Sequence, residues 1–479
     1  MSRSSPHDFD VLVLGGGPAG MVSAITASQH GLSVGLIDEQ AEAGGQIWRA
    51  PWAASSGKDA SPEVRDGHKM RETLARSNVS CLFGRRIWSV TDQYRVEVLG
   101  ADGVETYQAP HLIVALGAHE RVIPFPGWTL PGVMGLAAAT IMLKAHGLAP
   151  PKDWVLAGVG PLLAAVAAGY ARKGHPPKAI IDLSGPSDWL ATLPSLASRP
   201  GLFKQGVGWV VSILSSRIPI YFRHAIRRAE GQDRIAACVI GPVDQDGHRV
   251  AGPELSLDCD ALMIGNGLVP GGEVPRLLGA NQVYQHELGG WIPDCDRYGR
   301  TSLKHLYAIG DGAGIRGGAV ACSAGQLAGL AVAHDAGFID AASFARQSVQ
   351  PLTENQKLAA FSAAMAHMIR LRPAQVASIS PEAVICRCED VTRQDLVCAA
   401  KAGARDVNQL KHFTRCGMGP CQGRMCGDIA AEILAQEHQV SRQAVGYWTA
   451  RPPLRPISLQ SMLGRFEYSD IPIPKPAPL

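Results

Sequence analysis

The order of apolar and polar residues predicts buried strands that alternate with helices. Three apolar runs, at 11–14, 111–116 and 306–309, each lead into glycine, as strands covered on both faces of a parallel sheet do. An Ala-rich helical pattern follows the first run as far as Gln29, and a second strand is predicted over Ser33–Asp38. The sequence therefore predicts an α/β fold.

Two further patterns extend this picture. Between residues 79 and 99, three short segments alternate apolar and polar positions, which predicts antiparallel strands. The run 154–163 repeats the strand–turn–helix order, and a strand over 178–182 follows it and ends in an acid. The repeat predicts a second Rossmann-like dinucleotide-binding domain inserted into the first.

The predicted domains follow from these patterns. We expect a discontinuous first domain at 1–148 and 262–340, an inserted domain at 149–261, a helical linker at 341–380, a Cys-rich module at 381–440 and a Pro-rich tail at 441–479.

The turn after the first strand, Gly15-x-Gly17-x-x-Gly20, has the spacing of a dinucleotide phosphate site. Gly15 permits a tight turn, Gly17 lets the backbone approach a pyrophosphate, and Gly20 lets helix and strand pack closely. The free N–H groups and the dipole of the following helix favour the same anion. Asp38, 18 residues after Gly20, stands where a ribose-binding carboxylate is expected, and the adjacent Glu39 can share that role.

The inserted domain carries a weaker form of this motif. Leu163 stands where the third glycine belongs, and no basic run follows Asp182 to favour a 2′-phosphate. Asp182 either holds an NAD ribose or simply ends its strand. Binding of NAD(H) or of another nucleotide by this domain therefore stays open.

Composition excludes some classes of function. The net charge is +3, from 45 basic and 42 acidic residues, so there is no electrostatic case for binding nucleic acid. The short polar N-terminus does not resemble a signal peptide. The most apolar run, 155–171, contains Gly158, Gly160 and Pro161 and predicts strand, turn and helix rather than a transmembrane segment. We therefore expect a cytoplasmic protein.

Six of the 11 cysteines lie between residues 386 and 426. Without a secretory signal, clustered cysteines indicate a metal site rather than disulfides. The pairs Cys386-x-Cys388 and Cys421-x4-Cys426 can hold an iron–sulfur cluster or zinc. We favour the cluster, because zinc sites more often use C-x2-C pairs and because glycines beside Cys421 let N–H groups approach cluster sulfurs.

Residues 10–335 resemble the FAD-dependent pyridine nucleotide-disulfide reductase superfamily, on the first glycine turn, the insert and the Gly310-Asp311 end of a later strand. The resemblance implies that Asp311 hydrogen-bonds the ribityl chain of FAD; the alternative for this residue is a helix N-cap. The superfamily's redox-active cysteine pair is absent from the first domain, which argues against disulfide reduction. No catalytic residue is assigned, and the expected cofactor-binding residues are Gly15, Gly17, Pro18, Ala19, Gly20, Asp38, Glu39, Gly45, Gln46, Gly117, Gly310 and Asp311.

The cysteine pattern with the run 414–426 resembles the bacterioferritin-associated ferredoxin-like 2Fe–2S domain. Cys416 is then a spare thiol, and Cys398 a core residue on a helix. A set that uses Cys416 in place of Cys426 stays open, because its spacing to Cys421 is also four residues. The ligands that the resemblance implies are Cys386, Cys388, Cys421 and Cys426.

Three segments, 44–47, 118–134 and 451–456, point to one group of proteins within this resemblance. They are similar to the larger FAD/iron–sulfur subunits of hetero-oligomeric, dye-linked amino-acid and opine dehydrogenases, a group with opine oxidases, proline and D-hydroxyproline dehydrogenases and hydrogen cyanide synthase. The resemblance implies that a partner FAD subunit similar to D-amino-acid oxidase oxidises the C–N bond, that a small ferredoxin-like subunit can join, and that this chain relays the electrons.

Two other functions stay open. One is a stand-alone NAD(P)H-dependent flavoprotein that reduces ferredoxin or another acceptor, and the other is a zinc-stapled FAD protein that acts as a scaffold. The sequence does not name the substrate, because in the relay hypothesis that choice lies in another polypeptide.

Overall fold

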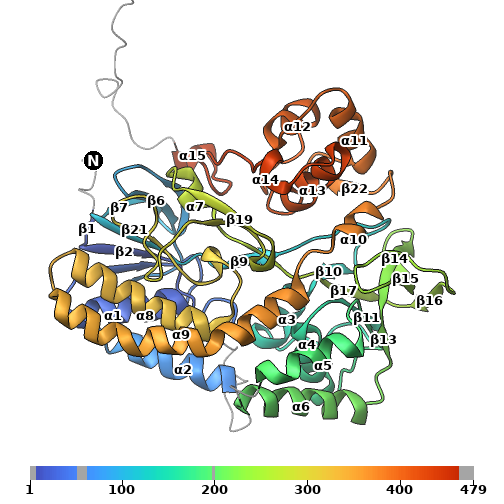
Figure 1. The fold of residues 1–479 in the computed structure, drawn as a ribbon, viewed down its shortest axis with the longest axis horizontal. Coiled ribbons are helices and arrows are strands. Elements are labelled where there is room, and N and C mark those ends of the chain that lie inside the picture. Colours follow the sequence, from blue (N-terminus) through green and yellow to red (C-terminus); the bar gives the residue numbers. More distant parts are fainter. Residues whose placement is uncertain (1–6, 51–61, 197–199, 463–479) are drawn as a thin grey trace, which may run out of the picture.

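The computed structural model describes residues 7–50, 62–196 and 200–462 of the 479-residue chain. Two α/β units, each built on a parallel sheet, lie side by side, and a small helical module with the clustered cysteines sits against them (Figure 1). This is the α/β arrangement, with two Rossmann-like units, that the sequence predicts.

The first sheet has five parallel strands in the order β21-β8-β2-β3-β4. One edge strand differs from the prediction, because β4 pairs parallel with β3 and not with the antiparallel strands that follow it. Helix α2 (Pro62–Ala75) separates β3 from β4, and such a strand–helix–strand crossover produces a parallel pair. The strand bounds are β2 Val11–Leu14, β3 Val34–Ile37, β4 Ser80–Leu82, β8 His111–Val114 and β21 Leu306–Ala308.

Strand β2 shows why this sheet is buried on both faces. Val11 and Val13 pack in one core with the helices α1 and α8, whereas Leu12 and Leu14 pack in another with Val98 of an antiparallel sheet. Alternate residues of a strand point to opposite faces, so a continuous apolar run satisfies both cores. The antiparallel sheet has the order β1-β7-β6-β5, with bounds His7–Asp8, Gly103–Gln108, Arg95–Gly100 and Arg86–Val90.

Three helices form the layer beneath the first sheet: α1 (Pro18–Gln29), α8 (Gly318–Asp335) and α9 (Ala341–Ile369) (Figure 1). The first two approach closely, because a Cβ on Gly325 would lie only 2.4 Å from Ala19 O. Helix α9 packs on α8 and is one 29-residue helix where the sequence predicts mixed helix and linker.

The second sheet is also parallel, in the order β10-β17-β11-β12-β13. Its outer strand β10 lies before residue 149, and β17 extends past residue 261, so the sheet is wider than the predicted insert. The bounds are β10 Val133–Gly135, β11 Trp154–Gly158, β12 Ala179–Asp182, β13 Ile220–Phe222 and β17 Ala261–Gly265.

Helices flank the second sheet, and short strands connect it to the first unit (Figure 1). The helices are α3 Leu136–Ala145, α4 Pro161–Arg172, α5 Pro186–Leu196 and α6 Pro200–Ser215, whereas α7 Glu273–Leu277 packs in the core of the first unit. The connecting strands are β9 Ala118–Glu120 paired with β18 Leu268–Pro270, and β19 Gln282–Gln285 paired with β20 Gly290–Pro293. A separate antiparallel set, β14 His224–Gly231, β15 Ile235–Pro242 and β16 Leu255–Asp258, lies on the side of the second unit away from the first (Figure 1).

The module has its own core, formed mainly by residues of three helices and a two-stranded ribbon. Its elements are β22 Val384–Cys386, β23 Val391–Thr392, α11 Arg393–Lys401, α12 Val407–Thr414, α13 Gly427–His438 and α14 Arg442–Val445, preceded by α10 Pro373–Ala377 and followed by α15 Leu459–Met462. In the described part of the chain, no helix combines the length and the apolar character needed to cross a membrane.

Candidate functional site

Each glycine of the first turn meets a different requirement. Gly15 has a φ of +104°, and a Cβ there would lie 2.4 Å from Ala115 O. A Cβ on Gly20 would lie 1.8 Å from Gly15 O, so strand and helix leave no room for one. A Cβ on Gly17, the N-cap of α1, would meet only Gly45 Cα, at 4.0 Å. The turn is therefore packed against protein at Gly15 and Gly20 and open at Gly17.

The carboxylate of Asp38 is fixed beside this turn. Its Oδ2 accepts a hydrogen bond from Gly16 N at 2.5 Å and its Oδ1 accepts one from Gln40 N at 2.7 Å. Burial raises the pKa of Asp38, although these two bonds oppose the shift. Glu39 is exposed, and its Oε2 lies 3.8 Å from Arg86 Nε. The structure thus turns Asp38 toward the turn and Glu39 toward the surface.

The loop that follows β3 completes one wall of the site. Gly44 N donates to Gly16 O at 2.8 Å, and a Cβ on Gly45 would lie 2.9 Å from Gly17 Cα. The side chain of Gln46 is exposed. Backbone of this loop, and not a side chain, therefore approaches the turn.

The ends of β8 and β21 meet at the same place. Gly117 O accepts a hydrogen bond from Gly271 N at 2.9 Å, and a Cβ on Gly312 would lie 3.3 Å from that oxygen. A Cβ on Gly310 would lie 3.0 Å from Ala19 Cβ, in the first turn of α1 that Pro18 begins. The candidate residues of three distant segments are therefore neighbours.

Asp311 lies at this junction with its carboxylate held by backbone. Its Oδ1 accepts from Arg316 N at 3.1 Å and Gly317 N at 3.2 Å, and burial raises its pKa. Gly317 is the N-cap of α8, so Asp311 also supports the start of that helix. Both bonds end on Oδ1, which leaves Oδ2 as the oxygen that can accept a hydroxyl group, so the two roles considered for this residue are compatible.

The second glycine turn, at the start of α4, is covered by the chain itself. A Cβ on Gly160 would lie 2.6 Å from Ile369 Cγ2, at the end of α9. Both oxygens of Asp182 accept internal hydrogen bonds, from Ser184 N at 2.8 Å and from Trp189 Nε1 at 2.9 Å. Leu163, in place of the third glycine, is 1% exposed in the core. At this turn the glycine, the acid and the residue in place of the third glycine all contact other parts of the chain.

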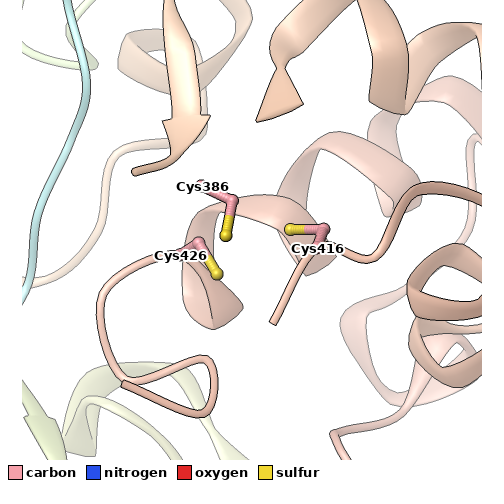
Figure 2. Close-up of side chains that lie close together, drawn as sticks. All are labelled: Cys386, Cys416 and Cys426. Atoms are coloured by element: carbon pink, nitrogen blue, oxygen red, sulfur yellow. The ribbon is translucent and has the colours of Figure 1, made fainter. Parts of the chain in front are cut away.

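Figure 2 shows three cysteines of the module with their sulfur atoms turned toward one another. The Sγ atoms of Cys386, Cys416 and Cys426 all lie within 4.8 Å of one another. The Cys421 thiol is hydrogen-bonded to the thiols of Cys426 and Cys388. Five sulfurs therefore form one group, which includes Cys416, the thiol that the sequence pattern sets aside.

Hydrogen bonds among these thiols shift their pKa values in opposite directions. Bonds from Cys416 and Cys426 lower the pKa of Cys386 to about 2, and a bond from Cys426 lowers that of Cys421 to about 5. The same bonds raise the pKa of Cys416 and Cys426. Thiolate is the form that binds metal, and these bonds favour it at Cys386 and Cys421.

The prediction for Cys398 is wrong. Its side chain is exposed on α11, where its Sγ accepts a hydrogen bond from Gln394 Nε2 at 3.4 Å. The helix buries the face that carries Leu396, Ala399 and Ala400, and residue 398 lies on another face.

Sequence reasoning missed Trp448, which covers the cysteine loops. A Cβ on Gly417, Gly423 or Gly427 would lie 3.2, 2.7 or 2.3 Å from the Trp448 ring. These glycines therefore make room for an indole, in addition to any approach of N–H groups to sulfur. The glycines near the cysteines could have indicated this contact, because several glycines in one loop favour the close approach of another group to the backbone.

Together, two dinucleotide-type parallel sheets and a glycine turn with its acidic partners define an oxidoreductase of the two-domain flavoprotein class. The model of the pyridine nucleotide-disulphide oxidoreductase family matches residues 9–337, so the chain belongs to this family. The predicted class, an FAD-dependent oxidoreductase, is confirmed. Residues 380–465 match the model of the sarcosine oxidase A3 domain.

Three similar proteins cover nearly the whole chain. An opine oxidase subunit of Agrobacterium tumefaciens (strain Ach5) is 31% identical over 95% of this chain and 91% of its own length. Hydrogen cyanide synthase subunit HcnB of Pseudomonas aeruginosa is 29% identical over 93% of this chain and 96% of its own. The crystal structure of L-proline dehydrogenase from P. horikoshii has a TM-score of 0.69 at 19% identity, over 96% of this chain and 80% of that chain, and so shares the fold.

Proposed function

We propose that this chain is the FAD- and iron–sulfur-containing subunit of a multi-subunit amino-acid or opine dehydrogenase, and that it relays electrons from C–N oxidation in a partner subunit to an acceptor. The observation that carries the proposal is the likeness to the opine oxidase subunit of Agrobacterium tumefaciens along 95% of the chain, joined to a group of five thiols packed against a flavoprotein fold. The expected partners are a subunit similar to D-amino-acid oxidase and a small ferredoxin-like subunit.

The residues around the first turn fit FAD. The open face at Gly17 and the N-terminus of α1 would receive the pyrophosphate, Asp38 would receive the adenosine ribose, and Asp311 Oδ2 would accept from the ribityl chain. A Cβ on Gly117 would meet no protein atom within 4 Å, so this residue leaves room between these groups, whereas Gly310 packs on Ala19 of α1. Bound FAD would supply the conversion between two-electron and one-electron transfer.

The cysteine group fits an iron–sulfur cluster held by four thiolates. We propose the ligands Cys386, Cys388, Cys421 and Cys426. A Cβ on Gly419 would lie 2.2 Å from Cys388 Cβ, so the loop that carries Cys421 packs directly on Cys388. The set that uses Cys416 in place of Cys426 stays open, and Cys416 also competes with Cys388, because its Sγ lies within 4.8 Å of those of both Cys386 and Cys426.

The docking of the module on the first unit supports a relay. Trp128 Nε1 donates to Val384 O at 2.8 Å, just before Cys386, and Arg424 Nε donates to Glu273 Oε1 at 2.7 Å, between Cys421 and Cys426. The second bond holds the Cys421 pair on α7 of the first unit, which carries the glycine turn, whereas the first bond joins the Cys386 pair to the core of the second sheet, where Trp128 packs. A fixed spatial relation between two redox groups is what electron transfer within one chain requires.

The proposal is tested by separating the chain from its partners. A tagged chain purified from its native host should retain a flavoprotein similar to D-amino-acid oxidase, identified by mass spectrometry, and this complex should reduce a dye with an amino acid or an opine. The isolated FAD-loaded chain should reduce the dye with none of these substrates. Turnover of an amine by the isolated chain would contradict the relay.

A further inference from the structure

A cavity of about 280 Å³ lies between the first unit and the cysteine module. Strands β18 and β20 and helix α7 line one side, and the loops 417–428 and 446–454 line the other. None of the residues of the Gly15–Gly20 turn lines it, so it is distinct from the FAD site.

The walls of this cavity carry an excess of positive charge. Five lining residues are basic and two are acidic: Arg276, Lys411, Arg424, Arg442 and Arg451 against Glu273 and Asp428. Both acids are already paired, since Glu273 Oε1 accepts from Arg424 Nε at 2.7 Å and Asp428 Oδ1 accepts from Arg442 at 2.9 Å. Among the described residues, no carboxylate forms an ion pair with Arg276, Lys411 or Arg451, so three cations face the cavity without one.

Three residues that line the cavity also carry buried hydrogen-bond donors that lack acceptors. The Nε atoms of Arg276 and Arg442 and the Nε1 atom of Trp291 are buried and have no hydrogen-bond partner among the residues that the structure describes. Arg442 is 8% exposed, and the Arg276 guanidinium is held 5.4 Å from the centre of the Tyr447 ring. Native proteins pair nearly all buried donors, so this wall of the cavity holds polar groups that the described residues do not satisfy.

Two of the unpaired cations repel each other. Desolvation lowers the pKa of Lys411, and the charge of Arg451 lowers it further. The Lys411 Nζ atom lies 6.0 Å from the centre of the Trp448 ring, at the edge of the cavity next to the cysteine loops. An anion between these two cations would relieve the repulsion.

We propose that this cavity binds a small organic or inorganic oxyanion, a carboxylate or a phosphate, whose oxygens accept hydrogen bonds from the guanidinium group of Arg276 and whose charge offsets Lys411 and Arg451. The proposal goes beyond the relay function, because it uses none of the residues assigned to FAD or to the cysteine ligands. It holds whether or not the chain serves an amine dehydrogenase.

Isothermal titration calorimetry of the full FAD-loaded chain at low salt tests the site with sodium phosphate and, separately, sodium pyruvate. Saturable binding of either probe is expected, and the probe that binds tells a phosphate ligand from a carboxylate. Arg276→Gln should weaken binding at least about tenfold. Arg95→Gln is the matched control, because it removes the same charge from a partly exposed pair with Glu97 on β6 and should leave binding unchanged.

If Arg276→Gln does not reach the wild-type unfolding temperature, Lys411→Gln replaces it, since Lys411 lies at the rim. Binding that stays unchanged in a folded cavity variant overturns the proposal. So does the absence of saturation by either probe up to about 10 mM, a concentration at which even a weak specific site fills.

Discussion

Arg121 and Asp428, 307 positions apart, form a buried ion pair in which Arg121 Nε lies 2.7 Å from Asp428 Oδ2. Burial alone would raise the pKa of Asp428, but Arg121 and Arg442 beside it lower the pKa to about 2. Asp428 lies in the first turn of α13, two residues after Cys426. The pair therefore fixes the start of this helix, and with it one cysteine of the group, on the first unit.

Arg121→Met should destabilise the docked module. The change leaves Asp428 buried with Arg442 as its remaining partner, and removal of one partner of a buried pair costs on the order of 3 kcal/mol. We expect a lower temperature of thermal unfolding and early proteolytic cleavage between α9 and the module. Arg95→Met, in a partly exposed pair, should cost less than about 1 kcal/mol. Equal stability of the two variants would show that the Arg121 pair does not hold the module.

Gly17→Ala and Gly20→Ala separate cofactor binding from folding. A Cβ at residue 17 meets no protein atom closer than 4.0 Å, and the φ of −73° suits alanine, so the fold should persist. The methyl group would occupy the space of the pyrophosphate, and we expect the affinity for FAD to fall at least about tenfold. Gly20→Ala should unfold the unit, because its Cβ would lie 1.8 Å from Gly15 O. Flavin absorbance per chain and the unfolding temperature measure the two effects, and a Gly17→Ala protein with full FAD content would refute the assignment.

The strands and the glycine turn were predictable because their signals are local. The run 11–14, the turn and Asp38 lie within 28 residues, and an apolar run covered on both faces needs no knowledge of its partners. Strand β10 was not predictable, because it has three residues and pairs with β17 far along the chain. Pairing of such distant segments depends on tertiary contacts that leave no periodic pattern.

The cysteine site was predictable only in part, for a similar reason. The spacing of the cysteines along the sequence indicates that their thiols cluster. Which sulfur atoms come into contact depends on the backbone conformation of the residues between them. Arg415 ends α12 with a φ of +63° and turns Cys416 into the module core, where it is buried. The error at Cys398 was avoidable, because the helical period of α11 places its apolar positions on another face.

Single substitutions at Cys388 and Cys416 should identify the fourth ligand. We expect Cys388→Ala to abolish the visible absorbance and EPR signal of the cluster while FAD remains, because only three of the four proposed thiolate ligands are then left. Cys416→Ala should retain both signals. Cys421→Ala is the positive control, since Cys421 belongs to either set. The opposite result, with loss in Cys416→Ala and retention in Cys388→Ala, would transfer the fourth position to Cys416.

Glu120→Gln should change how stability depends on pH. Burial raises the pKa of Glu120 from 4.5 to about 7, although its Oε1 accepts a hydrogen bond from Ala137 N at 2.7 Å. Between these two pH values the folded chain holds a proton that the unfolded chain releases. The contribution of this proton to the free energy of unfolding is fully present below pH 4.5 and is lost as the pH rises through about 7. Glutamine stays neutral and its carbonyl can keep the bond. The variant should show a flatter profile of unfolding temperature over this range and a higher value than wild type above it, whereas identical profiles would contradict the burial of a protonated carboxyl.

NADH should fail to bleach the flavin of the isolated, FAD-loaded chain when the two are mixed without oxygen. Ile369 covers the second glycine turn and Asp182 is only 3% exposed, so this turn leaves no open face for a pyrophosphate. Dithionite is the control, because it should reduce the same flavin and show that it is redox-active. Ile369→Ala opens the turn but leaves Asp182 bonded, and we expect this variant to resist NADH as well. Rapid bleaching of the wild-type flavin by NADH would instead favour a stand-alone reductase, in which the cysteine group serves as the electron outlet.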